Sequence, residues 1–241
     1  MTHLDHEVLD AQRQHWQTTF QANATMFGVN ASQPARYAIE LFTRNDIEKV
    51  LELGSGQGRD TLAFLKSGFT VIALDYAANA LAELTQAATD ATLEERLKTF
   101  PHDIRQPLPF PDESVDAVYS HMLFNMALTT TEITSLGEEV LRVLRPGGWH
   151  IYTVRHTGDS HFNTGISRGE NLSEHGGFIV HFFDSELVDQ LAVGFTPPEL
   201  VAFEEGSLPR KLWQVTQRKI AIYNDEHINE PHQNTGRGTT A

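Results

Sequence analysis

Short apolar runs alternate with longer amphipathic segments through most of the chain. Because apolar runs rich in β-branched residues are typical of buried strands, we expect strands at residues 49–53, 70–74, 97–101, 115–120 and 149–154. Between these runs, apolar residues recur at helical spacing, which predicts helices at residues 59–67, 77–88 and 131–144. Strands that alternate with helices form a mostly parallel sheet with helices on both faces. The pattern therefore predicts an α/β fold.

The alternation changes in the last third of the chain. Residues 156–177 are polar, contain glycine and are longer than an ordinary connector, which favours a lid-like insertion with a functional role. Residues 178–183 are apolar and strand-like and lead into an expected helix at 185–193. Residues 199–205 and 212–217 then alternate like two strands joined as a hairpin. These two strands bring the expected sheet to seven.

The two ends of the chain differ from this central pattern. We expect a helix over about residues 5–20, within an N-terminal helical cap at 1–35. Residues 36–220 form the predicted ligand-binding domain, which includes the insertion. Residues 224–241 are polar and rich in Gly and Thr without periodicity, and this predicts a disordered tail.

Composition excludes several kinds of partner. The chain has 18 Lys and Arg against 32 Asp and Glu, a net charge of −14, and this excess of carboxylates argues against a nucleic-acid partner. No apolar run is long enough to span a bilayer and the first residues do not resemble a signal peptide, so we expect no membrane association and a cytoplasmic location. Because the chain has no Cys and its His residues are irregularly spaced, we expect no metal site. The sequence leaves a monomer and a homodimer equally open.

The first candidate ligand-binding residues lie at the end of the first expected strand. This strand runs into Glu52, Leu53 and then Gly54-Ser55-Gly56-Gln57-Gly58, a turn that brings backbone amides close to a ligand. The second strand ends in Asp75, 21 residues after Gly54, at the place of a carboxylate that accepts hydrogen bonds from a ribose. The third strand leads to Asp103 and Ile104 at the same edge of the sheet. Three consecutive strand ends therefore indicate one nucleoside site.

The spacing of the glycines separates the possible cofactors. A dinucleotide turn has the form G-x-G-x-x-G, whereas the third glycine here comes one residue earlier. Glu52 and Asp60 would repel a pyrophosphate and attract a cationic sulfonium. Both features favour S-adenosyl-L-methionine over NAD or ATP.

These segments resemble those of class I S-adenosylmethionine-dependent methyltransferases. The resemblance covers residues 50–58, 71–76, 102–104, 110–120 and 141–148, in the family's order. It implies a Rossmann-like seven-stranded sheet with an antiparallel final strand, and S-adenosyl-L-homocysteine as the product. The cofactor-binding residues it implies are Glu52, Gly54, Ser55, Gly56, Gly58, Asp75, Tyr76, Asp103, Ile104, Ser120 and His121. Asp75 would hold the ribose, Tyr76 would flank the adenine, and Asp103 with Ile104 would read the adenine edge.

The methyl acceptor is constrained mainly by exclusion. Family members that methylate exocyclic base amines carry an Asp/Asn-Pro-Pro-aromatic turn after strand four, where this chain has Ser120-His121-Met122-Leu123. The absence of Cys disfavours pyrimidine-carbon and arsenite methylation in their usual form. Residues 15–34 resemble the N-terminal cap of the thiopurine and tellurite-resistance type. We therefore expect a small-molecule acceptor.

Candidate acceptor contacts come from both ends of the chain. Trp16 and Phe27 would form an apolar wall near the methyl group, or would only anchor a terminal helix to the core. In the insertion, the candidates are Arg155, His156, His161 and Arg168, which would orient the acceptor or would be incidental residues of a solvated loop. His121 is the candidate catalytic base, and a cofactor contact explains it equally well. The acidic pairs Glu138-Glu139 and Glu204-Glu205 are expected on the solvated surface.

Three functional hypotheses follow. The leading one is methyl transfer from S-adenosylmethionine to a small molecule by in-line displacement. The alternative is a non-catalytic adenosyl-binding regulatory module. An NAD-dependent oxidoreductase is disfavoured by the glycine spacing.

Overall fold

The computed structural model describes residues 6–23, 26–206 and 210–221. The predicted disordered tail at 224–241 lies outside these described residues. Within them, no helix is long and apolar enough to cross a membrane.

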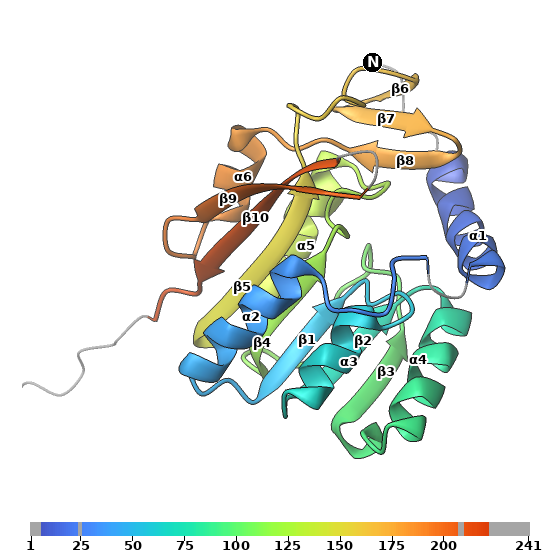
Figure 1. The fold of residues 1–241 in the computed structure, drawn as a ribbon. Coiled ribbons are helices and arrows are strands. Elements are labelled where there is room, and N and C mark those ends of the chain that lie inside the picture. Colours follow the sequence, from blue (N-terminus) through green and yellow to red (C-terminus); the bar gives the residue numbers. More distant parts are fainter. Residues whose placement is uncertain (1–5, 24–25, 207–209, 222–241) are drawn as a thin grey trace, which may run out of the picture.

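A seven-stranded sheet forms the centre of the molecule (Figure 1). In spatial order its strands are β3 (Leu97–Pro101), β2 (Thr70–Asp75), β1 (Lys49–Leu53), β4 (Val115–His121), β5 (Leu144–Arg155), β10 (Arg210–Arg218) and β9 (Glu199–Glu205). The strands β1 to β5 run parallel, and β10 is antiparallel to both β5 and β9. The predicted fold class and the antiparallel final strand are confirmed. The final strand β10 lies inside the sheet, and β9 forms its edge.

Helices cover both faces of this sheet. Each face of the sheet forms a hydrophobic core with its helices. Alternate residues of β1 point to opposite faces, so Leu51 packs in one core and Val50 in the other. On the first face lie α5 (Thr130–Val143) and α6 (Ser185–Leu191). On the second face lie α2 (Gln33–Arg44), α3 (Arg59–Lys66) and α4 (Ala78–Asp90), and a 3-10 turn, η1 (Glu94–Arg96), follows α4.

The helix α2 is an element that the alternation pattern did not predict. The Ser32 side chain caps it by accepting a hydrogen bond from the Ala35 amide, and Pro34 occupies its first turn. Its buried side chains Ala35, Ala38 and Phe42 pack on the second face of the sheet. The helix therefore spans the proposed boundary between the cap and the domain at residues 35 and 36.

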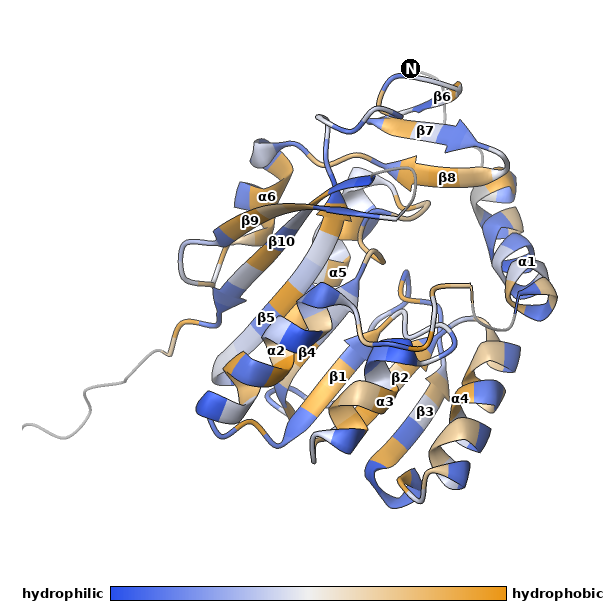
Figure 2. Cartoon of the chain, in the orientation of Figure 1, coloured by the Kyte–Doolittle hydropathy of each residue, from blue (hydrophilic) through white to orange (hydrophobic). Residues whose placement is uncertain are grey.

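The insertion after β5 contains a small antiparallel sheet. Its strands are β6 (Ile166–Gly169), β7 (Leu172–His175) and β8 (Phe178–His181). The expected seven-stranded sheet is confirmed; of this second sheet, only the strand-like segment at 178–183 was expected. The helix α1 (His6–Ala22) lies beside β8 and α4, and together α1 and β8 cover the carboxyl ends of the parallel strands (Figure 1). Figure 2 shows that β8 is mainly apolar whereas α1 is largely polar. The covered end of the sheet is where the candidate residues gather.

Candidate active site

A cavity of about 610 Å³ opens at the carboxyl ends of the parallel strands. Its lining combines the glycine turn after β1 with the ends of β2, β3 and β4, the helix α1, the strand β8 and the first residue of β10. Doubly wound folds bind their ligands at this edge of the sheet. Most of the predicted cofactor and acceptor residues line this one cavity.

The glycine turn depends on backbone conformations that favour glycine. Gly54, Gly56 and Gly58 have φ of 72°, 52° and 82°, in the left-handed region. A Cβ on Gly58 would lie 2.2 Å from Leu84 Cδ1, and one on Gly54 would lie 2.9 Å from Leu123 Cδ1. The amides of Gly54 and Ser55 donate to the Leu74 carbonyl oxygen at 2.8 and 3.1 Å, which ties the turn to β2. The turn is therefore fixed, and its three glycines leave room for a ligand to approach the backbone.

Asp75 closes the second strand beside this turn. Its carboxylate accepts hydrogen bonds from the amides of Gly56 and Ala77, each at 2.8 Å. Burial raises the pKa of this carboxyl above its ordinary value, although the backbone hydrogen bonds act in the opposite direction. Nearby, the Ser55 hydroxyl is buried without a partner and also lines the cavity. The turn therefore presents one carboxylate and one unused hydroxyl to a ligand.

After the end of β3, the side chain of Arg105 holds the Asp103 carboxylate. Arg105 Nε lies 3.0 Å and Arg105 Nη2 lies 2.6 Å from the Asp103 carboxylate, while Arg105 Nη1 donates to Asp10 of α1 at 2.8 Å. Burial raises the pKa of Asp103, but the hydrogen bonds and charge of Arg105 outweigh it and lower this pKa. Ile104 and Tyr76 add apolar surface to the same wall, and the Tyr76 hydroxyl donates to the Gln12 carbonyl oxygen at 3.3 Å. The adenine-edge candidates thus also connect the sheet to the cap.

Two buried carboxyl groups lie beneath the turn. Glu52 accepts a hydrogen bond from Thr61, and burial together with the charge of Asp60 raises the pKa of Glu52 well above its usual range. Asp60 accepts from the Ser32 amide, the Ser32 hydroxyl and the Tyr119 hydroxyl at 2.8, 2.7 and 2.9 Å. Asp60 therefore joins α3 to the start of α2 and to β4.

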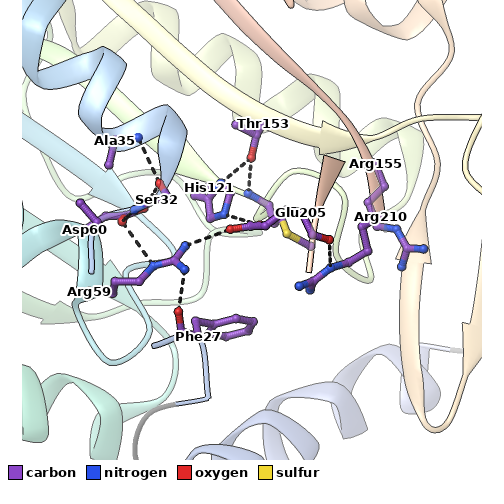
Figure 3. Close-up of polar contacts among 12 residues, drawn as sticks. Phe27, Ser32, Ala35, Arg59, Asp60, His121, Thr153, Arg155, Glu205 and Arg210 are labelled. Atoms are coloured by element: carbon purple, nitrogen blue, oxygen red, sulfur yellow. Dashed lines mark hydrogen bonds and ion pairs between the residues drawn. The ribbon is translucent and has the colours of Figure 1, made fainter. Parts of the chain in front are cut away.

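His121 lies at the end of β4, and both of its ring nitrogens have partners (Figure 3). Thr153 Oγ1 lies 2.8 Å from Nδ1 and accepts the Met122 amide at 2.9 Å. Because an ionised Glu205 can only accept, the hydrogen of a neutral His121 ring is on Nε2, and the Thr153 hydroxyl donates to Nδ1. The Nε2–H then donates to Glu205 at 3.1 Å. In this arrangement, no unprotonated nitrogen of His121 faces the cavity.

The expectation that Glu205 is a solvated surface residue is wrong. Its carboxylate, at the end of β9, contacts His121 and also lies 3.6 Å from Arg59 (Figure 3). Burial raises the pKa of Glu205, but the hydrogen bond from His121 and the charges of Arg59 and Arg210 outweigh it and lower this pKa to about 2. Only the antiparallel pairing of β9 with β10 brings this carboxylate to the site.

Aromatic side chains form the wall between the cap and the cavity. The ring of Trp16 lies 5.4 Å from Phe20, 6.3 Å from Phe27 and 5.0 Å from Phe178. All four rings line the cavity. Trp16 and Phe27 therefore face the cavity and also anchor α1 to the domain.

The candidates from the insertion divide into two groups. Arg155 and His161 line the cavity, and Arg155 is buried in an ion pair with Asp159 at 2.6 Å. His156 instead stacks on Trp213 at 4.4 Å, and Arg168 pairs with Glu174. Neither His156 nor Arg168 belongs to the cavity lining, and Ser120 is fully buried behind it.

The cavity also contains residues that sequence reasoning did not single out. Gln12 and Phe178 carried no signal beyond apolar or helical periodicity, and Arg59 followed the glycine turn without an assigned role. The same holds for Arg105, two residues after Asp103, and for Arg210. Among the described residues, no three His, Asp or Glu side chains converge as metal ligands.

The lining residues fit an adenosyl sulfonium. The cavity offers the groups that a ribose and an amino acid require: the Ser55 hydroxyl, which has no partner among the described residues, the backbone of the glycine turn, and the Asp75 carboxylate. Tyr76 and Ile104 supply the flat apolar surface that an adenine requires.

Comparison with known proteins agrees with this geometry. A family model described as a methyltransferase domain matches residues 50–148. An uncharacterized methyltransferase of Mycolicibacterium vanbaalenii is 35% identical over 107 residues, which are 44% of this chain and 39% of that protein. A fatty-acid O-methyltransferase of Mycolicibacterium smegmatis is 35% identical over 133 residues, 49% of this chain and 43% of that protein. The chain spans about two fifths of the length of these curated relatives.

Solved structures show the same fold. The 1,6-didemethyltoxoflavin-N1-methyltransferase of Burkholderia thailandensis, solved with 1,6-didemethyltoxoflavin and S-adenosylhomocysteine, superposes with a TM-score of 0.68 at 20% identity, covering 89% of this chain and 90% of that one. TehB from Haemophilus influenzae superposes with a TM-score of 0.59 at 16% identity, covering 85% and 67%. The segment 50–148 is therefore similar to a methyltransferase domain, and the whole described chain shares its fold with these two solved proteins.

Proposed function

We propose that this protein transfers a methyl group from S-adenosylmethionine to a small-molecule acceptor. The observation that carries the proposal is the meeting of three strand ends at one cavity, with Gly54–Gly58, Asp75 and Asp103 in its lining. The coverage of this cavity by α1 and β8 supports an enclosed small acceptor rather than an extended polymer.

The bound cofactor supplies an electrophilic methyl group on a cationic sulfur. The chain's own residues would hold and orient it: Asp75 at the ribose, Tyr76 and Ile104 at the adenine, and the glycine turn at the amino-acid end. The aromatic wall of Trp16, Phe27 and Phe178 would exclude water from the reacting carbon. Alignment and exclusion of water are the main requirements of an in-line displacement.

His121 is better explained as a positioning residue than as a free base. Both ring nitrogens are engaged, so proton abstraction would first require either the release of Thr153 from Nδ1 or the loss of the Nε2 proton that Glu205 accepts. Through Thr153 and Glu205, His121 links the ends of β4, β5 and β9 at the cavity. We propose that this link fixes the floor of the acceptor site.

Other expectations remain part of the proposal. The net charge of −14 supports an acceptor other than nucleic acid. A cytoplasmic location and a monomeric or homodimeric state stay predictions, and light scattering on the purified chain checks the second.

Isothermal titration with S-adenosylmethionine, S-adenosylhomocysteine and NAD tests the cofactor assignment. We expect both adenosyl ligands to bind, NAD not to bind, and Asp75→Ala to weaken binding at least tenfold because a buried carboxylate loses its ligand contacts. Asp90→Ala is the matched control, because it removes one exposed carboxylate at the end of α4 outside the cavity. Equal binding by Asp75→Ala and wild type would contradict the proposal.

A methyl-transfer screen separates the enzyme from a regulatory module. Transfer of labelled methyl to a member of a small-molecule panel supports the enzyme. Tight adenosyl binding without transfer to any member would favour the non-catalytic alternative.

A further inference from the structure

The cavity has a second end, away from the glycine turn, where the polar groups differ. This end is lined by Arg155 of β5, His161 and His175 of the insertion, and Arg210 at the start of β10. These side chains are hydrogen-bond donors or can act as donors, whereas beside the glycine turn the cavity is lined by the Asp75 carboxylate, which has no ion-pair partner among the described residues. The two ends therefore suit ligand groups of different charge.

Arg210 is the clearest of these donors. Its Nε donates to the backbone oxygen of Glu205 at 3.4 Å (Figure 3). Within the described part of the chain, no carboxylate lies within ion-pair distance of its guanidinium group. Of the four cavity-lining arginines, Arg59, Arg105 and Arg155 all have such a partner. The two terminal nitrogens of Arg210 therefore have donor capacity that the described residues do not use.

His161 supplies a second donor. Arg155 Nη2 lies 3.1 Å from His161 Nδ1, and an arginine can only donate, so Nδ1 accepts. The ring hydrogen of neutral His161 must then be on Nε2. Burial, with the charge of Arg155, lowers the pKa of His161, which keeps the ring neutral near pH 7.

One buried carboxylate holds these donors in place. Asp159 accepts from Arg155 Nε and Nη2 at 3.1 and 2.6 Å, and from the amide of His161 at 2.8 Å. It also accepts from the amide of Lys211 at 2.8 Å, the residue next to Arg210. Asp159 therefore ties the first residues of β10 to the insertion beside the cavity.

The carboxylates near this end are already engaged. Asp159 accepts four hydrogen bonds, and Glu205 contacts His121 and Arg59. A cationic acceptor would find no free carboxylate here, whereas an anionic group would find unused N–H donors. The second end thus favours an anion.

We propose that the methyl acceptor carries an anionic group, a carboxylate or a phosphate, which Arg210 binds with its terminal nitrogens and His161 assists with its Nε2–H. This inference rests on the proposed function, since it concerns the acceptor of that reaction. The apolar body of the acceptor packs against Phe178 and Val180 of β8 and against Met126, which line the same cavity. Arg155 acts through His161 as a positioning residue.

Titration of anionic and neutral probes into protein saturated with S-adenosylhomocysteine tests this site. The probes share one ring system: 2-naphthoate, 2-naphthyl phosphate and the neutral 2-naphthalenemethanol. We expect at least one anion to bind about tenfold more tightly than the alcohol, with an affinity that falls as salt rises. The better of the two anions identifies the anionic group as carboxylate or phosphate.

Arg210→Gln should reduce the affinity of the preferred anion to that of the alcohol. Lys211→Gln is the matched control, because it removes one positive charge from the neighbouring residue of β10, whose side chain points to the opposite face. Arg155→Gln is less suitable because it would leave the buried Asp159 charge unpaired.

Two results would overturn the inference. One is that neither anion binds more tightly than the alcohol to protein that binds S-adenosylhomocysteine. The other is that Lys211→Gln loses as much anion affinity as Arg210→Gln. Failure of wild-type protein to bind S-adenosylhomocysteine is a different result and counts against the proposed function itself.

Discussion

At the scale of single residues, the glycine turn shows how backbone conformation and packing act at one position. Gly58 has φ of 82°, and a Cβ there would meet the buried Leu84 side chain at 2.2 Å. A side chain at this position would meet both a conformational penalty and a clash. The turn therefore requires glycine for two independent reasons.

Gly58→Ala should destabilise the fold by about 2–4 kcal/mol and weaken S-adenosylhomocysteine binding. Urea unfolding and calorimetric titration measure the two effects. Gly176→Ala is the matched control, since Gly176 also has positive φ, 57°, but no atom lies within 4 Å of its added Cβ. If the two variants lose the same stability, the contact with Leu84 contributes nothing.

The hydrogen bonds of His121 give a second prediction at this scale. Because neither ring nitrogen is free, we expect His121→Gln to lower kcat less than about tenfold and to leave the pH profile of kcat unchanged. The measurement uses whichever acceptor the methyl-transfer screen identifies. A loss of about 10²-fold or more, together with loss of the acidic limb of the profile, would show that His121 is the base.

At the scale of elements, the position of α1 depends on polar contacts with several loops. Gln12 is buried, donates to the Gly177 carbonyl oxygen at 2.9 Å and accepts from the Ile179 amide at 3.3 Å. Arg105 pairs with Asp10, and Gln57 donates to the Asn23 carbonyl oxygen at 3.1 Å. The cap is thus tied both to β8 and to the loops that would hold the cofactor.

Gln12→Ala should loosen the cap, because it removes two buried hydrogen bonds worth about 1–3 kcal/mol together. We expect faster hydrogen exchange across α1 and β8 and a few-fold faster release of S-adenosylhomocysteine. Gln14→Ala, on the exposed side of the same helix, should change neither rate. Unchanged exchange in Gln12→Ala would show that the aromatic wall alone holds the cap.

At the scale of the whole molecule, stability is coupled to pH through a histidine in the core. The ring of His150 lies 4.8 Å from that of Tyr152 and 5.6 Å from that of Phe124. Gln217 Nε2 lies 3.1 Å from its Nδ1. Burial lowers the pKa of His150 from 6.5 to about 3. Between these two pKa values the ring is therefore neutral in the folded protein and protonated in the unfolded chain.

The sign of the effect follows from proton binding. Between pH 6.5 and about pH 3 the unfolded state binds one more proton at His150, so the free energy of unfolding falls as pH falls. This group contributes up to about 1.4 kcal/mol per pH unit within that window and nothing above it. We expect His150→Phe to be less sensitive to pH between 4 and 6 than wild type, as measured by urea unfolding at each pH. Parallel slopes for the two proteins would contradict the prediction.

The sequence alone determined the parallel core and the adenosyl end of the site. Strand ends in a parallel sheet come to one edge, so the positions of Gly54, Asp75 and Asp103 follow from local patterns and strand order. The strands at 49–53 and 97–101 match β1 and β3 residue for residue, the first a buried strand and the second the edge strand of the sheet. The helix α2 was not predicted because it precedes the first strand, and the prediction of helices relied on their alternation with strands.

The acceptor end was decided only by tertiary structure. Arg210 lines the cavity, and Glu205 contacts the cavity residue His121, because β10 pairs antiparallel with β5 and β9, and no local pattern fixes the pairing with β5 across more than 50 residues. His156 and His161 lie in the same insertion, yet one stacks on Trp213 and the other lines the cavity. Residue type and spacing establish where parallel strands end, since that geometry is local and repeated. The orientation of side chains in a long insertion depends on distant partners, and these exist only in the folded chain.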